Sequence, residues 1–170
     1  MSDAGRSRVA RDEHGERAKF EDIEIGADLG SLEWRVTAED VAKQCLIDDD
    51  YHENYALGDF DTGKFAPPQI QYRPPRWLFS RTYNVRGVFY RWKFENVKPI
   101  RIGETYLVTG RVASKWIKNN REFVAFEFEA NDEKGDVVFR TTRVHALDVI
   151  ERTAPREGHG IDSGIKQEKI

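Results

Sequence analysis

The stretch VFYRWKF, residues 88–94, decides the fold class, because apolar and polar side chains alternate along it with the period of a β-strand. Three later stretches, within residues 106–112, 124–128 and 137–149, alternate in the same way. Turn-forming residues separate these stretches at 102–104, 118–120 and 131–136. Long strands that follow one another through short turns predict an antiparallel meander.

The first half of the chain predicts one more strand and two helices. Leu32, Trp34 and Val36 alternate as a strand, and Thr37 then has the position of an N-cap for a helix over residues 38–47. Proline at 74 and bulky residues after it predict a second helix over residues 74–83. The apolar side of the first helix is expected to contain Val41, Ala42, Cys45 and Leu46. We therefore expect an α+β protein in which a curved antiparallel sheet wraps around one helix.

The 170 residues suit a single domain, which we place at residues 20–151. Residues 1–19 and 152–170 have few apolar side chains and are expected to be flexible tails. The one cysteine, Cys45, cannot form an internal disulfide, which favours a reducing compartment. We find no apolar run of the roughly 20 residues that cross a bilayer, and no signal peptide at the N-terminus. The expected location is the cytoplasm, without membrane attachment.

Charge is unevenly distributed along the chain. Residues 39–61 contain eight acidic side chains and only Lys43 as a base, whereas residues 73–101 contain eight basic side chains and only Glu95 as an acid. One interpretation is that the two surfaces partly neutralise each other. The other is an anionic ligand, with phosphates on the arginine-rich surface and its reacting end near the acidic segment. The net charge of -3 argues against a general nucleic-acid binder.

The most reactive combination of side chains is DDDYHEN, residues 48–54, followed by the FAPPQI turn at 65–70. A carboxylate beside an imidazole can hold one water molecule and transfer protons in both directions. The alternative is a solvated loop, because consecutive carboxylates usually face water. Their spacing matches neither a calcium loop nor a zinc motif, so we expect no metal. His145 is in phase with Phe139 and Leu147 and is expected in the interior or at an interface.

The order of these features resembles that of the MaoC-like hot-dog dehydratases, which include the (R)-specific enoyl-CoA hydratases. The resemblance covers about residues 20–150 and depends on the DDDYHENYA segment at 48–56, the FAPP turn at 65–68 and the VKPIRIGET junction at 97–105. It extends to the NDEKGDVV hairpin at 131–138. The resemblance implies a hot-dog fold, and it assigns the catalytic roles to Asp48 and His52. It also implies a substrate-binding set of Asn54, Pro68, Gln69, Ile70, Arg73 and Arg76.

Two positions depart from the pattern of the family. The family aspartate is five residues before its histidine, where this chain has Ile47, and Asp48 is one residue closer without the usual asparagine-proline pair. The family glycine whose N–H receives the thioester oxygen aligns with Pro68, which has no N–H. The N–H of Gln69 or Ile70 would then have to take that role.

The resemblance implies a hydro-lyase that adds or removes water across the 2,3 double bond of an enoyl-CoA or an enoyl-carrier-protein thioester, with no cofactor. A second hypothesis is a non-catalytic hot-dog protein that binds acyl-CoA or pairs with an active dehydratase. A third is a phosphate or nucleic-acid binder that uses the arginine-rich surface, with affinity that falls steeply as salt rises. The resemblance also implies a homodimer, a larger homo-oligomer or a heterodimer.

Overall fold

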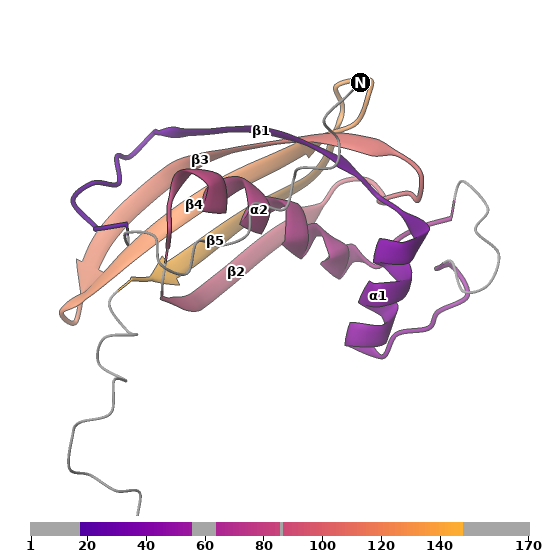
Figure 1. The fold of residues 1–170 in the computed structure, drawn as a ribbon, viewed down its shortest axis with the longest axis horizontal. Coiled ribbons are helices and arrows are strands. Elements are labelled where there is room, and N and C mark those ends of the chain that lie inside the picture. The colour runs from indigo at the N-terminus through magenta and orange to yellow at the C-terminus, as the bar shows by residue number, and fades with distance from the viewer. Residues whose placement is uncertain (1–17, 56–63, 86, 148–170) are drawn as a thin grey trace, which may run out of the picture.

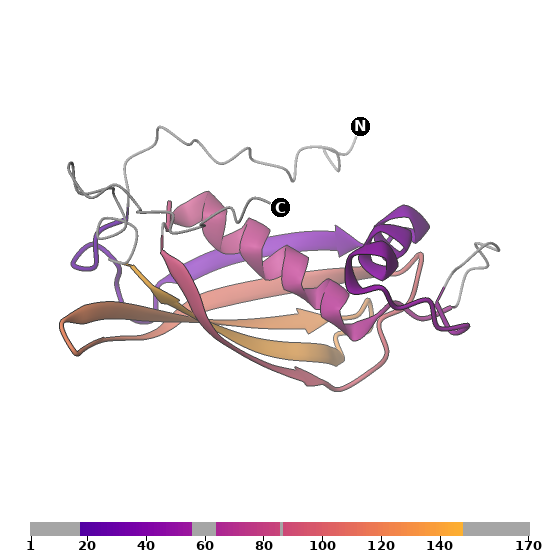
Figure 2. The same cartoon turned by 90° about the horizontal axis from the view of Figure 1, so that it is seen from below.

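The protein is described by a computed structural model over residues 18–55, 64–85 and 87–147. Five antiparallel strands form one sheet in the order β1-β3-β4-β5-β2, and α2 lies across one face of it (Figure 1). The sheet curves beneath α2 (Figure 2), as the sequence predicted. The elements are β1 (Asp28–Arg35), α1 (Ala38–Asp48), the 3-10 helix η1 (Pro68–Tyr72), α2 (Arg73–Thr82), β2 (Val88–Asn96), β3 (Thr105–Lys118), β4 (Arg121–Asn131) and β5 (Val137–Ala146).

The core lies between α2 and the inner face of the sheet. Leu78 and Phe79 of α2 are buried, and the Phe79 ring stacks on that of Phe126 with centroids 5.2 Å apart. Prolines at 74 and 75 are tolerated because the first turn of a helix needs no N–H donor there. The burial of Leu32, Trp34 and Val36 confirms the alternation predicted for the first strand.

Helix α1 begins as predicted, and it buries less than predicted. The Thr37 hydroxyl accepts the Asp40 N–H at 3.1 Å and donates to the Asp40 carboxylate at 2.8 Å. Val41 and Cys45 are fully buried, but Leu46 is 71% exposed, so its predicted place on the buried side was wrong. The reason is the position of α1 beyond the end of the sheet (Figure 2), where only a narrow stripe of the helix is covered.

Strand β2 is an edge strand, since β5 is its neighbour on one side and the sheet ends on the other. Its register against β5 shifts between Phe89 and Arg91, which places a bulge at Tyr90. The sequence predicted an unbroken alternation from Val88 through Tyr90 to Phe94. That prediction was wrong at Tyr90, where the bulge interrupts the alternation of faces. The ring centroids of Tyr90 and Phe123 are 5.0 Å apart. Trp92 instead donates a hydrogen bond from Nε1 to the Thr141 hydroxyl at 2.7 Å.

The tight turn between β3 and β4 confirms the turn predicted at 118–120. Lys118 pairs with Arg121, and the two residues between them, Asn119 and Asn120, have φ angles of 52° and 56°. Asparagine tolerates this left-handed conformation better than most residues, and two such residues form the hairpin turn whose twist matches the strands.

The predicted tails lie outside the described residues, apart from Ala18 and Lys19. Ala18 is half-buried and its N–H donates to the carbonyl of Asn84 at 3.1 Å. Asp59, Asp61 and Arg86, which contribute to the two charged stretches, also lie outside the described residues, as does Ala56. In the described part of the chain, no helix is long and apolar enough to span a membrane.

Candidate functional site

The acidic segment begins at the last residue of α1. Asp48 is exposed, and its Oδ2 accepts a hydrogen bond from Nε2 of Gln44 at 2.8 Å, one helical turn earlier. Asp49 ends the helix in the left-handed conformation, with a φ angle of 52°. The Asp48 carboxylate is thus oriented by a buried amide while it remains accessible to solvent.

His52 is exposed on the same segment. Its Nδ1 accepts the backbone N–H of Asn54 at 3.2 Å, and its ring centroid is 5.9 Å from that of Tyr55. Because Nδ1 acts as an acceptor, a neutral ring carries its proton on Nε2. This tautomer makes Nε2–H a hydrogen-bond donor.

A pocket of about 390 Å³ lies next to this segment. Three separate pieces of chain form it: residues 54–55, residues 65–68 and residues 96–100. Backbone hydrogen bonds join these pieces, from Phe65 N–H to Asn54 O at 3.2 Å and from Ala66 N–H to Ile100 O at 2.8 Å. The lining residues are Asn54, Tyr55, Phe65, Ala66, Pro68, Asn96, Val97, Lys98, Pro99 and Ile100.

The pocket includes only part of the residue set implied by the family resemblance. Asn54 and Pro68 line it, whereas Asp48 and His52 do not. Pro68 begins η1, and the N–H of Ile70 already donates to the carbonyl of Pro67 at 3.0 Å. The N–H of Ile70 is therefore already engaged, which leaves the N–H of Gln69 as the remaining candidate donor, and neither residue lines the pocket.

The two predicted arginines differ in their surroundings. Arg73 forms an ion pair with Asp40 at 3.0 Å, which joins the basic stretch to the acidic one. This ion pair supports, at one pair of residues, the interpretation that the acidic and basic stretches neutralise each other. Arg76 is exposed and has no carboxylate partner among the described residues. Of these two side chains, Arg76 is the one that no described carboxylate neutralises.

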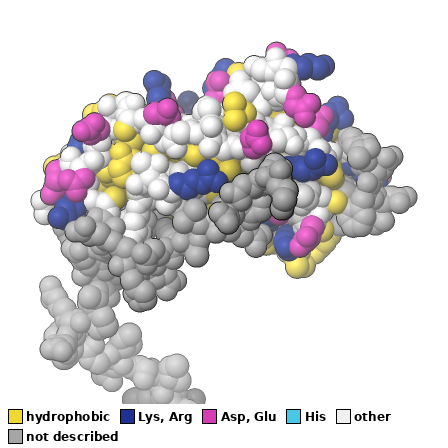
Figure 3. Space-filling view, turned by 45° about the horizontal axis from the view of Figure 1, so that its top comes forward, with side chains coloured by type: hydrophobic (Ala, Val, Ile, Leu, Met, Phe, Trp, Pro, Cys, Tyr) yellow, Lys and Arg dark blue, Asp and Glu magenta, His cyan; other side chains and the backbone are white. Residues whose placement is uncertain are grey.

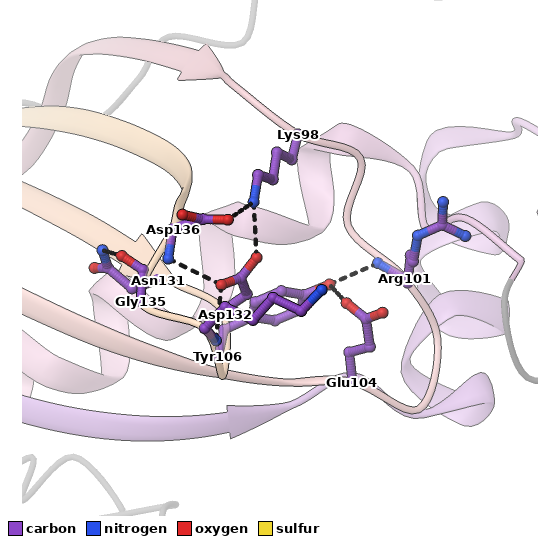
Figure 4. Close-up of polar contacts among 9 residues, drawn as sticks. Lys98, Arg101, Glu104, Tyr106, Asn131, Asp132, Gly135 and Asp136 are labelled. Carbon is purple, nitrogen blue, oxygen red and sulfur yellow. Dashed lines mark hydrogen bonds and ion pairs between the residues drawn. The ribbon is translucent and has the colours of Figure 1, made fainter.

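A polar network supports the wall of the pocket that contains Lys98 (Figure 4). The Lys98 ammonium contacts Asp136 at 2.6 Å and Asp132 at 2.9 Å, and these hydrogen bonds raise the pKa of Lys98. The hydrogen bond from Lys98 is also the main cause of the lowered pKa of Asp132.

Nearby, the Tyr106 hydroxyl donates to Glu104 at 2.8 Å and accepts from the Arg101 N–H at 2.8 Å. Burial raises the pKa of Tyr106 strongly, so the hydroxyl is a fixed donor.

The surface beyond the pocket mixes both signs of charge. On the face drawn in Figure 3, acidic and basic side chains alternate with apolar patches, without a single continuous basic area. No group of three or more potential metal ligands is present in the ranges that the structure describes.

Sequence reasoning missed most of the pocket and one buried charge. The contribution of residues 96–100 was signalled only by the VKPI junction, whose place beside residues 54–55 depends on the folded chain. Arg143 was also missed. The signal that could have found it is its position in phase with Phe139 and His145 on β5, which places its side chain on the same face as theirs. Both of those residues are buried, and His145 contacts the Phe79 ring with centroids 5.1 Å apart. Its burial confirms the predicted interior position of His145.

The chain has the hot-dog fold, with a curved antiparallel sheet around a central helix. No family model and no curated protein matches its sequence. Among solved structures, it is similar to the truncated HadBC (3R)-hydroxyacyl-ACP dehydratase complex of Mycobacterium tuberculosis, with a TM-score of 0.63, 14% identity and coverage of 72% of this chain and 96% of that chain. It is also similar to the R-hydratase PhaJ1 of Pseudomonas aeruginosa, with a TM-score of 0.59, 12% identity and coverage of 75% and 84%.

A third similar structure is the MaoC-like dehydratase of Rhodospirillum rubrum, with a TM-score of 0.56, 19% identity and coverage of 75% of this chain and 94% of that chain. These structures have in common the hot-dog fold as it occurs in MaoC-like hydratases and dehydratases. At these identities the likeness defines the fold, and function has to be argued from the site.

Proposed function

We propose that this chain is a hot-dog subunit of the acyl-thioester hydratase or dehydratase class, and that it works in a pair with a second hot-dog subunit. The observation that carries the proposal is the position of the 390 Å³ pocket. It is lined by Asn96, the last residue of the edge strand β2, and it lies directly beside the segment that contains Asp48 and His52. The ligand is the acyl thioester of coenzyme A or of a carrier protein.

Strand β2 supports the pairing. Edge strands present unpaired backbone groups, and proteins usually protect them with charge, with proline or with a covering element. Here β2 carries the exposed charges of Arg91, Lys93 and Glu95. It also keeps large apolar side chains in the open, because Tyr90 is 54% exposed and Phe94 is 43% exposed. The partner is a second copy or a related hot-dog chain, and the named HadBC complex is an assembly of that kind among the similar structures.

In this proposal the pocket holds the thioester and its acyl chain. Phe65, Val97 and Ile100 provide apolar contact, and Asn54 provides a polar group at the side of the pocket that faces residues 48–52. Pro68 cannot donate to the thioester oxygen, because proline has no N–H. The second subunit is therefore proposed to supply the donor that stabilises the enolate, a contribution of about 3 kcal/mol in enzymes where such donors have been removed.

The second candidate is a chain that is catalytic by itself, and the local geometry of residues 48–54 favours it. Gln44 orients the Asp48 carboxylate, and the Asn54 N–H orients the His52 ring. In hydration, Asp48 would remove a proton from water as its oxygen attacks the β-carbon. His52, in its doubly protonated imidazolium form, would donate a proton from Nε2 to the α-carbon and become neutral, and the Gln69 N–H would donate a hydrogen bond to the thioester oxygen.

An enoyl-CoA hydration assay separates the two candidates. Purified protein is incubated with short and medium enoyl-CoA substrates, and loss of the enoyl-thioester absorbance is followed for the parent, for His52→Ala and for the matched control Glu53→Gln. Binding without turnover by this chain alone supports the first candidate with a different hot-dog chain as the partner. Turnover that falls by a factor of about 100 or more in His52→Ala, but not in the control, supports the catalytic chain. Absence of both binding and turnover contradicts both candidates.

The proposed location is the cytoplasm. The one cysteine, Cys45, is fully buried and reduced, in keeping with a compartment where thiols persist.

A further inference from the structure

Arg143 is a charged side chain in the interior of the protein. It lies on β5 and is only 1% exposed. Its guanidinium carbon is 4.2 Å from the ring centroid of Tyr72, 4.6 Å from that of Phe89 and 5.6 Å from that of Phe79. One terminal nitrogen donates to the Tyr72 carbonyl at 3.0 Å, and the buried Nε has no hydrogen-bond partner among the described residues.

The charge of Arg143 is not balanced within the described part of the chain. No carboxylate there pairs with it. The Tyr72 side chain stabilises its charged form, whereas a second cation, Arg76, disfavours it. Burial is the main cause of the lowered pKa of Arg143, about 10. Tyr72 partly offsets it by raising the pKa, and Arg76 lowers the pKa slightly further. Buried charges are normally paired, and two neighbouring cations without an anion are the surroundings that an incoming anion would stabilise.

The geometry around Arg143 leaves at least one in-plane donor buried and unpaired among the described residues. Tyr72 and Phe89 lie over the guanidinium as cation–π partners, and the N–H groups of a guanidinium project in its plane, away from such faces. The unpartnered Nε is one of these in-plane donors. A carboxylate or a phosphate matches this planar fork.

Arg143 lies on β5, the strand next to the edge strand β2. Trp92 of β2 is its register partner, and Tyr72, Phe89 and Trp92 are all half-buried. Tyr72 is the last residue of η1, which begins at the pocket residue Pro68. Its neighbour Gln71 donates to Asn96, another pocket residue, at 2.6 Å. The rings that cover Arg143 are thus continuous with the candidate ligand pocket.

We propose that Arg143, assisted by Arg76 at the surface, is an anion-recognition site that takes an oxyanion group of the ligand, either a carboxylate on the acyl chain or a phosphate of the thioester carrier. The ligand group enters between η1 and β2 as the Tyr72 ring moves aside. This inference rests on the proposed function for the thioester part of the ligand, whereas the anion site itself does not depend on it.

The test measures dissociation constants by calorimetry for three thioesters that differ in charge. Crotonyl-pantetheine has no charge, glutaconyl-pantetheine adds a carboxylate, and crotonyl-CoA adds phosphates. We expect at least one charged thioester to bind the parent about tenfold or more tightly than the neutral one, which corresponds to one charge-assisted hydrogen bond. The thioester that gains affinity identifies the source of the oxyanion.

Three variants show whether the gain depends on this site. Arg143→Met is expected to abolish the advantage of the charged thioester, and the exposed Arg76→Gln is expected to reduce it without affecting the fold. Arg81→Gln, an exposed arginine of the same helix as Arg76, is the matched control and keeps the advantage. Equal affinity for all three thioesters in the parent overturns the proposal. The proposal is also overturned if the charged thioester keeps its full advantage in affinity in Arg76→Gln. This result can be obtained even if Arg143→Met does not fold.

A second arm separates this proposal from the proposed function. The midpoint of thermal unfolding is measured in malonate, in inorganic phosphate and in chloride at equal ionic strength. Stabilisation of the parent by malonate or phosphate, reduced in Arg76→Gln, supports the anion site even if no thioester binds. Thioester binding without any effect of these anions or of Arg76→Gln leaves the proposed function standing and overturns the anion site.

Discussion

Lys98 holds two carboxylates of the β4–β5 turn against the wall of the pocket. Its hydrogen bond is the first cause of the lowered pKa of Asp132, so Lys98→Met should move that pKa upward toward its ordinary value. The stabilisation from ionised Asp132 is present above the ordinary pKa of an aspartate and is lost as pH falls through the lowered value. Carboxyl-carbon NMR titration measures the change directly.

Lys134→Met is the matched control for Lys98. Lys134 contacts Asp132 through its backbone N–H, at 3.0 Å, and its side chain is exposed. The pKa of Asp132 should therefore stay in place in this variant. An unchanged pKa in Lys98→Met would contradict the assigned cause.

Phe79 is the central contact between α2 and the sheet. It is 1% exposed and stacks on Phe126, so Phe79→Ala should lower the free energy of unfolding by about 3–5 kcal/mol. Leu46→Ala should change it by less than about 0.5 kcal/mol, because Leu46 is 71% exposed. Urea denaturation measures both. A loss in Leu46→Ala as large as that in Phe79→Ala would contradict the arrangement of α1.

At the scale of elements, the open edge of β2 makes the pairing testable. Phe94→Lys places a charge on that edge, where a lysine opposes pairing with another strand. We expect sedimentation to show a smaller assembly than the parent forms. Ile25→Lys, at a residue that is 60% exposed and lies before β1, is the control and should keep the assembly of the parent. A monomeric parent, or an assembly that Phe94→Lys leaves intact, would contradict pairing of this chain with itself through β2.

Local signals were sufficient for most of the elements. The N-cap at Thr37, the prolines at the start of α2 and the Asn119-Asn120 turn act within a few residues, and each was found from the sequence. The bulge at Tyr90 could not be found in this way. The alternation of residues 88–94 continues through it, and only the register against β5 shows which side chains change face.

At the scale of the whole molecule, the sequence singled out the segment at 48–54 and the turn that follows it at 65–70, and it could not define the pocket. Residues 96–100 reach the pocket through the backbone pairing of Ala66 with Ile100, which depends on the folded chain. The same limit applies to Arg143, whose surroundings come from η1, α2 and β2 together. Long-range contacts of this kind have no signature within a single stretch of sequence.

The central claim is that the pocket beside residues 48–54 binds an acyl thioester. Calorimetric titration with crotonyl-CoA tests it most directly when the parent is compared with Asn54→Trp, which fills the pocket, and with Glu53→Trp, an exposed neighbour that does not line it. We predict saturable binding by the parent and by Glu53→Trp, and affinity at least about tenfold weaker in Asn54→Trp. Equal binding by all three proteins, or no binding by the parent, would contradict the account.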